Sequence, residues 1–247
     1  MEHLTSRKNP LIRHMRLLGS DTGYRREQGE YVLDGRKLLQ EAVTFGANVK
    51  AVLWAGEPAM DVPGAAVYTA PKDLVEYASP LKNAPGPVFT VEIPKQKLPA
   101  APKKVILLEN VQDPGNVGTV IRTANALGMD AVVLLGNCAS IFGAKTARAA
   151  MGALFRQCTV EMERAEAIAW LHAQSLQIYG AALSDRAVDV RTVSVQNAAF
   201  IVGSEGQGLS EEMLGLCDGE VIIPMMPNSE SLNAGVAASI LMWELSR

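Results

Sequence analysis

The feature that most constrains the fold is a repeated order of elements over residues 105–247. Short apolar runs typical of buried strands occur at residues 105–109, 131–135, 157–161, 177–182, 199–202 and 220–223. Helix-compatible segments alternate with them at residues 116–128, 144–151, 164–174, 210–216 and 232–245. Parallel strands need a long connection between them, which is usually a helix. This order therefore predicts an α/β domain with a parallel sheet that helices cover on both faces.

The first part of the chain also alternates, but over fewer elements. An amphipathic helix is predicted to begin at Pro10 and to end at Gly19, because its apolar residues recur at helical spacing. Further strands are expected at residues 30–33, 49–54 and 87–93, and further helices at residues 35–45 and 71–78. This pattern indicates a second, smaller α/β domain.

A stiff connection separates the two parts. Residues 94–104 read P-K-Q-K-L-P-A-A-P-K-K and contain three prolines and four lysines, with little to bury. We therefore expect one domain over residues 1–97, a linker over residues 98–104 and a second domain over residues 105–247.

Charge is distributed unevenly between these parts. Residues 1–104 contain 15 Lys and Arg against 11 Asp and Glu, a balance of +4, whereas the whole chain has a formal net charge of −3. The remainder therefore has a balance of −7. The first part is the better candidate for a surface that faces phosphate groups, although a balance of +4 also fits an ordinary solvated surface.

The composition excludes several classes of protein. No apolar run approaches the roughly 18 residues of a membrane span, and the first ten residues lack the apolar core of a signal peptide. Cys138, Cys158 and Cys217 lie far apart without metal-ligand spacing. We therefore expect a cytoplasmic protein with buried free thiols and no metal site.

Three strand ends run into polar, glycine-rich or proline-rich turns that open helices. They lie at residues 107–135, which contain L-L-E-N-V-Q-D-P-G-N-V-G-T-V-I-R, at residues 200–210, F-I-V-G-S-E-G-Q-G-L-S, and at residues 224–237, P-M-M-P-N-S-E-S-L-N-A-G-V-A. Such turns present backbone N–H groups to a ligand. A nucleotide-cofactor oxidoreductase is the weaker reading, because no G-x-G-x-x-G follows the first strand of this domain.

In order and in residues, these three stretches resemble the three motifs of the SpoU (TrmH-type) RNA 2′-O-ribose methyltransferases of the SPOUT superfamily. The resemblance covers about residues 105–247. It implies that S-adenosylmethionine binds in a trefoil knot, that the chain forms a homodimer through the knotted domain, and that RNA is the substrate. Residues 1–97 look similar to the L30e-type RNA-binding domain that often precedes the catalytic domain in this family.

The resemblance also assigns residues to roles. Arg122 matches the arginine placed at the acceptor ribose. Because a guanidinium is not deprotonated in proteins, we expect it to hold phosphate and to stabilise the reacting oxygen rather than to act as a free base. The resemblance leaves open a direct base role, and whether the arginine acts within its own subunit. The full catalytic set is Asn116, Arg122, Glu205, Ser231 and Asn233. The implied donor-binding set is Gly203, Glu205, Gly206, Ile223, Met225, Ser231, Leu232 and Asn233.

Basic residues are the candidates for RNA contact, since phosphate neutralisation dominates RNA affinity. The predicted set is Arg7, Lys8, Arg13, Arg25, Arg26, Lys145 and Arg148.

The resemblance leaves the substrate open, with ribosomal RNA favoured over transfer RNA because of the N-terminal domain. A non-catalytic RNA-binding protein that kept the knot is a rival reading, and the complete polar set argues against it. The chain departs from the family pattern at Ala234-Gly235, where valine or alanine followed by serine is more usual. We expect this change to loosen bonding around the site without removing its main polar groups.

Overall fold

The computed structural model describes residues 1–82, 86–95, 97–227 and 230–247, and the chain divides into two compact units. Unit 1 comprises Met1–Lys95 together with Phe142–Phe155, and unit 2 comprises Gln96–Ile141 together with Arg156–Arg247. The sequence assigned residues 142–155 to the second domain. In the structure this internal segment belongs with the first part of the chain.

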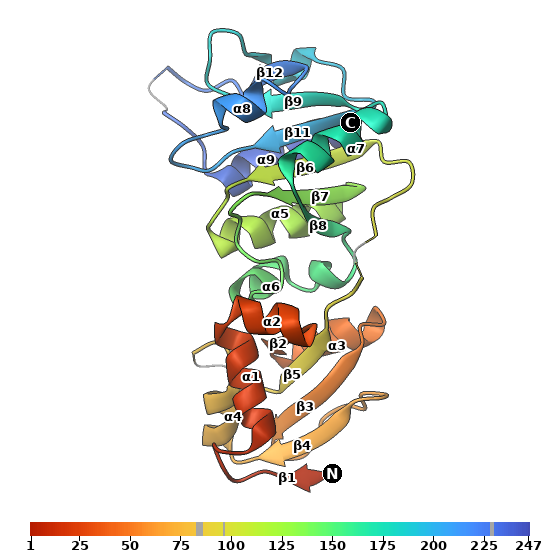
Figure 1. Cartoon of the computed structure of the whole chain (residues 1–247), viewed down its shortest axis with the longest axis vertical. Helices are drawn as coiled ribbons and strands as arrows, with labels where there is room; N and C mark the ends of the chain where they lie inside the picture. Colours follow the sequence, from red (N-terminus) through yellow and green to blue (C-terminus); the bar gives the residue numbers. More distant parts are fainter. Residues whose placement is uncertain (83–85, 96, 228–229) are drawn as a thin grey trace. The chain divides into compact units, whose positions relative to one another are not determined.

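Unit 1 is built on a mixed five-stranded sheet with the order β1-β4-β3-β5-β2 (Figure 1). The pairs of β3 with β4 and of β4 with β1 are parallel, and β5 runs antiparallel to both β3 and β2. Its strands are β1 (Glu2–His3), β2 (Glu30–Asp34), β3 (Val49–Ala55), β4 (Ala66–Ala70) and β5 (Val88–Glu92). Its helices are α1 (Pro10–Ser20), α2 (Thr22–Gln28), α3 (Arg36–Thr44), α4 (Lys72–Ala78), α6 (Ala144–Ala150) and the short 3-10 helix η1 (Ala153–Phe155).

The first helix forms as its sequence indicates. Asn9 caps it, because its side-chain oxygen accepts the backbone N–H of Leu11 at 2.9 Å, and Pro10 fits the first turn. Ile12, Met15 and Leu18 recur at helical spacing and are buried. This helix therefore packs an apolar stripe on the sheet and leaves its basic residues outside.

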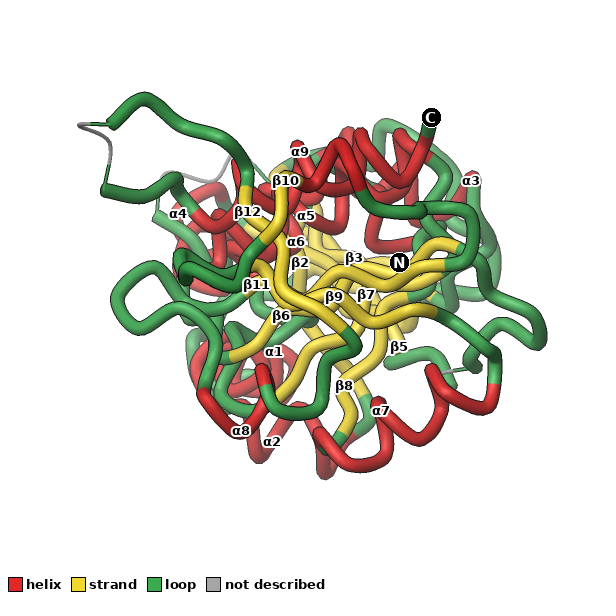
Figure 2. The backbone as a smooth tube through the Cα atoms, turned by 90° about the horizontal axis from the view of Figure 1, so that it is seen from above, coloured by secondary structure: helices red, strands yellow, loops and turns green. Residues whose placement is uncertain are grey.

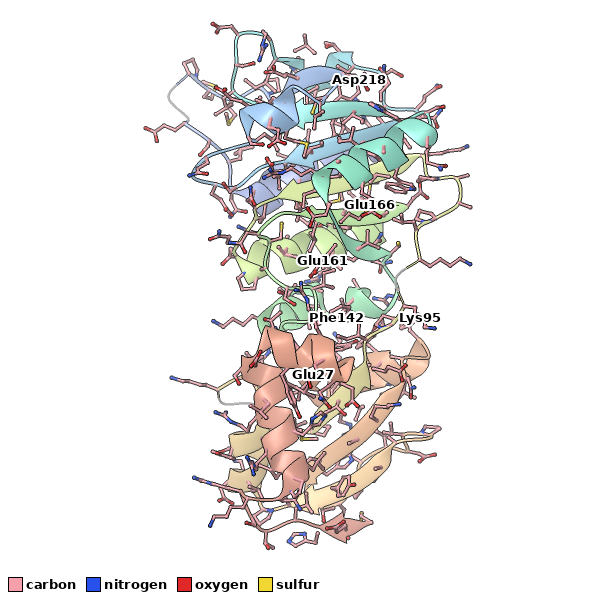
Figure 3. All side chains as sticks on the ribbon, in the orientation of Figure 1. Glu27, Lys95, Phe142, Glu161, Glu166 and Asp218 are labelled. Atoms are coloured by element: carbon pink, nitrogen blue, oxygen red, sulfur yellow. The ribbon has the colours of Figure 1, made fainter. Side chains whose placement is uncertain are left out.

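The segment of residues 142–155 is attached to unit 1 by both apolar and charged contacts. The ring of Phe142, labelled in Figure 3, lies 4.9 Å from that of Tyr31 between centroids, and Ala147 is part of the same core. Arg148 forms an ion pair with the nearly buried Asp34 at 2.9 Å. Since a buried carboxylate needs a partner, this ion pair gives the segment a fixed place.

Unit 2 contains a seven-stranded sheet with the order β10-β12-β9-β11-β6-β7-β8, and all of its strand pairs are parallel. This confirms the predicted α/β class with a parallel sheet. The strands are β6 (Lys104–Glu109), β7 (Ala131–Leu135), β8 (Thr159–Met162), β9 (Gln177–Ala181), β10 (Val188–Asp189), β11 (Ala198–Val202) and β12 (Gly219–Ile222). The helices are α5 (Pro114–Leu127), α7 (Arg164–Ala173), α8 (Glu211–Leu214), α9 (Ala234–Ser246) and the 3-10 helix η2 (Val190–Thr192).

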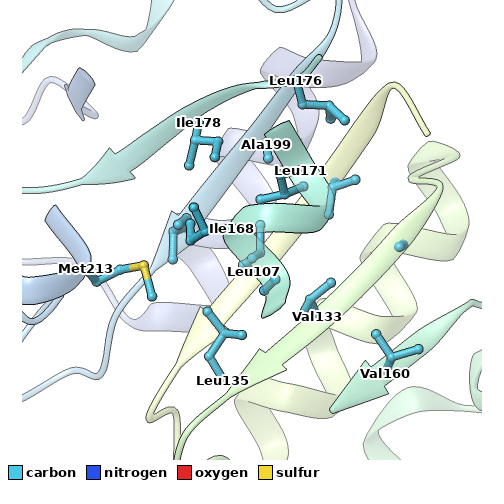
Figure 4. Close-up of a cluster of buried hydrophobic side chains, with 14 of the residues drawn as sticks. Leu107, Val133, Leu135, Val160, Ile168, Leu171, Leu176, Ile178, Ala199 and Met213 are labelled. Atoms are coloured by element: carbon cyan, nitrogen blue, oxygen red, sulfur yellow. The ribbon is translucent and has the colours of Figure 1, made fainter. Parts of the chain in front are cut away.

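Helices cover both faces of this sheet. Figure 2 shows α7 and α8 on one side and α5 and α9 on the other. The core under α7 and α8 (Figure 4) joins Leu107 and Val133 of the sheet to Ile168, Leu171 and Met213 of the helices. Because strand residues alternate between faces, the intervening Ile106 and Leu108, also fully buried, serve the other face. No described helix is long and apolar enough to cross a membrane.

Candidate functional site

A cavity of about 440 Å³ lies at the carboxyl ends of β9, β11 and β12. This is the edge of a parallel sheet where ligands usually bind. Four stretches form its wall: the residues that follow β9, the loop after β11, the end of β12, and the approach to α9. The lining residues include Ala181–Ser184, Val202–Leu209, Val221–Ile223, Met225, Ser231, Leu232, Ala234 and Ala237. Its size falls in the range of small-molecule sites.

The loop of residues 203–209 is folded tightly on itself. Gly208 donates its N–H to the carbonyl of Ser204 at 2.9 Å, and Gly208 has a positive φ of 66°. A Cβ on Gly203 would lie 2.1 Å from the backbone of Gly208. Two glycines are therefore needed for the loop to close, one for close approach and one for its left-handed conformation.

A hydrogen bond joins the first predicted motif to this loop. Asp113 caps α5 by accepting the N–H of Asn116 at 2.8 Å, which fixes Asn116 in the first turn. The Asn116 side chain then donates from Nδ2 to Oε1 of Glu205. Two residues that lie 89 positions apart in the sequence are thus in direct contact at one wall of the cavity.

The first turn of α9 approaches the same place. Asn233 caps this helix by accepting the N–H of Val236 at 3.2 Å. A Cβ on Gly235 would lie 3.1 Å from Oδ1 of Asn116 and 3.3 Å from Oδ1 of Asn233. The glycine in the Ala234-Gly235 pair therefore leaves room for two amide side chains that come together beside the cavity.

Most of the residues expected to bind the donor line one cavity. They are Gly203, Glu205, Gly206, Ile223, Met225, Ser231 and Leu232. Asn233 instead lines a second hollow on α5 and α9. Their role as binding residues stays a prediction, and Asn228 and Ser229 of the same motif lie outside the described residues.

The sequence did not single out the stretch Ala181–Ser184, which contributes to the cavity from the end of β9. These residues have no motif of their own. The available signal is positional, because the end of any strand beside β11 in a parallel sheet lies at the same edge.

Arg122 lies on α5 and is exposed. Within the described part of the chain, no hydrogen bond or ion pair involves its guanidinium. Its five N–H donors are therefore open to solvent or to a ligand.

The predicted RNA-binding residues differ in their surroundings. Arg7, Lys8, Arg13, Arg26 and Lys145 are exposed, and Arg148 is half exposed but paired with Asp34. Arg25 requires a correction.

The Arg25 side chain is buried, and its guanidinium donates to the carbonyl of Leu18 at 2.8 Å and to the Thr22 hydroxyl at 2.7 Å. The Arg25 guanidinium therefore binds the end of α1 and the start of α2 inside unit 1, and it is not available to contact RNA.

The three cysteines are free and partly buried rather than fully buried. Burial, together with the nearby carboxylates of Asp218, Glu220 and Glu109, raises the pKa of Cys217 to about 12. This thiol therefore stays protonated at neutral pH and is a poor nucleophile. In the described residues, no group of three or more His, Cys, Asp and Glu side chains could hold a metal ion.

Comparison with known proteins shows the family. Residues 103–243 match the model of the SpoU rRNA Methylase family. The chain is 32% identical to the 23S rRNA (guanosine(2553)-2′-O)-methyltransferase RlmP of Bacillus subtilis, over 99% of both chains.

Solved structures give the same result. An AdoMet-bound rRNA methyltransferase from Sinorhizobium meliloti superposes with a TM-score of 0.87 at 26% identity, covering 98% of this chain and 96% of that chain. The SpoU methyltransferase AviRb from Streptomyces viridochromogenes in complex with AdoMet has a TM-score of 0.87 at 25% identity, covering 97% of this chain and 98% of that chain. The protein belongs to the SpoU rRNA methylase family.

Proposed function

We propose that this protein transfers a methyl group from S-adenosylmethionine to a ribose 2′-hydroxyl of ribosomal RNA. The observation that carries the proposal is the cavity at the carboxyl ends of β9, β11 and β12, whose wall contains residues of the second and third motifs and touches the first through Asn116 and Glu205. Family membership supplies the reaction class, and the similarity to RlmP favours ribosomal RNA.

The cavity fits the donor in size and in lining. Small residues and apolar side chains such as Leu209, Ile223 and Leu232 dominate its wall, and the closed glycine loop lets backbone groups approach a ligand. S-adenosylmethionine supplies an electrophilic methyl group when it is bound. The protein residues that would hold it are the lining residues named above.

The other residues of the predicted catalytic set have separate roles. Arg122, which is charged at any physiological pH, binds a phosphate near the acceptor ribose and stabilises the 2′-oxygen as it loses its proton. The Asn116–Glu205 hydrogen bond holds the first motif against the donor loop. Ser231 and Asn233 come just before α9. Ser231 lines the cavity and Asn233 lines the second hollow, so together they orient donor and acceptor.

The substrate class is tested with RNA from cells that lack this protein. Purified enzyme and S-adenosylmethionine labelled in its methyl group would be incubated with total RNA, and ribosomal and transfer RNA would then be separated. We expect label in one ribosomal RNA. Label in transfer RNA alone would support the alternative of a transfer-RNA methyltransferase. Donor binding without transfer to either RNA would keep the donor site but make the substrate assignment wrong. No donor binding at all would favour a non-catalytic RNA-binding protein.

Unit 1 is proposed to bind the RNA as an L30e-like domain. Support comes from exposed basic residues on and before α1, namely Arg7, Lys8 and Arg13. The Arg7 guanidinium lies 4.5 Å from the centroid of the Tyr77 ring, and that of Arg16 lies 5.0 Å from it. Stacking on a ring orders these cations without neutralising them, so their charge stays available to phosphate groups.

Replacing Arg7 and Arg13 with alanine is expected to weaken RNA binding at every sequence and to lower the salt dependence. The slope of log affinity against log salt should fall by about 1 for each arginine, since each contacts one phosphate. Fluorescence anisotropy with labelled RNA over a salt series measures this. Lys50→Ala is the matched control, because Lys50 already pairs with Glu92 at 3.0 Å. An unchanged slope in the double variant would argue against this RNA surface.

We also propose that two copies form a homodimer through α5 and α9. The helix α9 buries Ala238, Leu241, Met242 and Leu245, yet Val236 and Trp243 on its other side are 48% and 59% exposed. This apolar face borders a hollow of about 420 Å³ lined by Thr119, Asn233, Gly235, Val236, Ser239, Ile240 and Trp243. A second copy would cover the face and would place α5, which carries Arg122, at the interface.

Trp243→Glu is expected to convert the dimer to a monomer, because a charge at the centre of an apolar interface loses its hydration without gaining a partner. Analytical ultracentrifugation would show about half the mass of the wild type. Trp243→Phe keeps the apolar contact and should remain dimeric. A wild type that sediments as a monomer at micromolar concentration would contradict the interface.

Two further features follow from family membership. We propose that the C-terminal segment is threaded through a loop as a trefoil knot, which is supported by the packing of α9 on β6, β11 and α5. We also propose a cytoplasmic location, because ribosomal RNA is the proposed substrate.

A further inference from the structure

The strand β6 ends on a buried carboxylate. Its sequence, K-V-I-L-L-E, is apolar until Glu109, which is 0% exposed. A charged group in such a place is strongly destabilising unless hydrogen bonds and an opposite charge compensate for it. Glu109 does not line the cavity, and the roles proposed above do not use it.

Both carboxylate oxygens of Glu109 have partners from one residue, Ser210. The backbone N–H of Ser210 donates to Oε2 at 2.9 Å, and its hydroxyl donates to Oε1 at 2.8 Å. Arg164, at the start of α7, places its Nε 2.9 Å from Oε1 and supplies the positive charge. The buried carboxylate therefore accepts two hydrogen bonds from Ser210 and has the charge of Arg164 beside it. Hydrogen bonds to a charged group are the stronger kind, so Ser210 is held firmly.

Ser210 is the point at which the loop of residues 203–209 ends. The loop leaves the sheet after Val202, which pairs with Leu108 of β6. It returns at Ser210, which is bound to the next residue of β6, Glu109. Two consecutive residues of one strand therefore hold both ends of the loop, and this loop forms a wall of the cavity.

We propose that Glu109 is a positioning residue for the donor: through Ser210 it fixes the ends of the loop, so that the cavity has its binding shape before the donor enters. The proposal rests on the proposed function, because it takes S-adenosylmethionine as the ligand of this cavity. A loop that is already ordered raises affinity, because binding then loses less conformational entropy.

The negative charge of Glu109, and not only the shape of its side chain, is needed to hold Ser210 and Arg164. A glutamine at position 109 has one oxygen and one NH₂ group. If its oxygen accepts the N–H of Ser210, its NH₂ group takes the place of Oε1 and faces Arg164, which can only donate. Arg164 would also lose the buried partner of its charge. Among the described residues it would keep Glu212 as an ion-pair partner, 3.3 Å away on the exposed side.

The test measures binding of S-adenosylhomocysteine, the demethylated donor, by isothermal titration calorimetry in the full chain. We expect Glu109→Gln to raise its Kd about tenfold or more, Ser210→Ala to raise it by a similar factor, and the double variant to be little worse than Glu109→Gln alone. Ser210→Thr keeps the hydroxyl and should restore affinity close to that of the wild type. Glu212→Gln changes the other partner of Arg164, is exposed, and should leave the Kd within about twofold.

A second readout separates positioning from a general loss of stability. RNA affinity and the kcat at saturating donor should stay close to wild type in Ser210→Ala, while the KM for the donor rises. A donor Kd within about twofold of the wild type in folded Glu109→Gln, or losses that add fully in the double variant, would overturn the proposal. If Glu109→Gln does not fold, the comparison of Ser210→Ala with Ser210→Thr decides in the same way. A wild type that binds no donor would overturn the proposed function and this inference with it.

Discussion

Replacing Gly203 with alanine is expected to abolish donor binding. The added Cβ would lie 2.1 Å from the carbonyl carbon and oxygen of Gly208 and 2.3 Å from the nitrogen of Leu209. All three are backbone atoms, so the loop must open rather than adjust a side chain. We expect the donor Kd to rise at least about 100-fold and the free energy of unfolding to fall by about 2 kcal/mol.

Calorimetry and urea denaturation measure the two effects. Gly206→Ala serves as the control for stability, because a Cβ on Gly206 meets no atom within 4 Å. Its free energy of unfolding should stay within about 0.5 kcal/mol of the wild type. Donor binding by Gly203→Ala with wild-type affinity would show that the loop does not have to close for the cavity to form.

The second large effect is expected at Arg122. Arg122→Ala should lower kcat about 10³-fold, because the variant removes the cation that stabilises the reacting oxygen. Donor affinity and stability should be unchanged. The Arg122 side chain is exposed, has no hydrogen bond or ion pair within the described residues, and does not line the cavity.

Arg122→Lys distinguishes charge from geometry. Lysine keeps the positive charge but cannot bind a phosphate through two parallel N–H groups, so we expect an activity between those of the wild type and the alanine variant. Single-turnover methyl transfer at saturating donor and RNA measures the step. Wild-type turnover in Arg122→Ala would remove the arginine from the mechanism.

The parallel sheet of unit 2 could be predicted because its strands are buried on both faces and therefore read as continuous apolar runs. The runs expected at residues 131–135 and 199–202 coincide closely with β7 (Ala131–Leu135) and β11 (Ala198–Val202). Elements with weak local patterns were missed. The helix α2 reads T-G-Y-R-R-E-Q, and its start depends on Asp21, whose carboxylate accepts the N–H of Tyr24 at 3.0 Å.

Long-range partners explain the other differences. The segment of residues 142–155 reads as part of an α/β alternation, and only the contacts of Phe142 with Tyr31 and of Arg148 with Asp34 show that it belongs to unit 1. Arg25 looked like a surface cation for a different reason. Its partners are near in sequence, but the carbonyl of Leu18 reaches it only because α1 ends and α2 turns back beside it.

In the candidate site, too, some features have a local sequence signal and others depend on tertiary contacts. The three motifs indicated most of the residues that line the cavity, since a glycine-rich turn after a strand is a local signal. The link between Glu109 and Ser210 spans 101 positions and has no local signature. Motifs therefore located the cavity, and the tertiary structure was needed to see what holds its wall in place.

The measurement that tests the central claim most directly is the chemical position of the transferred methyl group. Ribosomal RNA labelled by the enzyme would be hydrolysed in alkali, which cleaves every linkage that has a free 2′-hydroxyl. We predict label in an alkali-resistant dinucleotide that nuclease and phosphatase convert to a ribose-methylated nucleoside, and no such product with Arg122→Ala. Label recovered in mononucleotides carrying a methylated base would contradict transfer to the ribose.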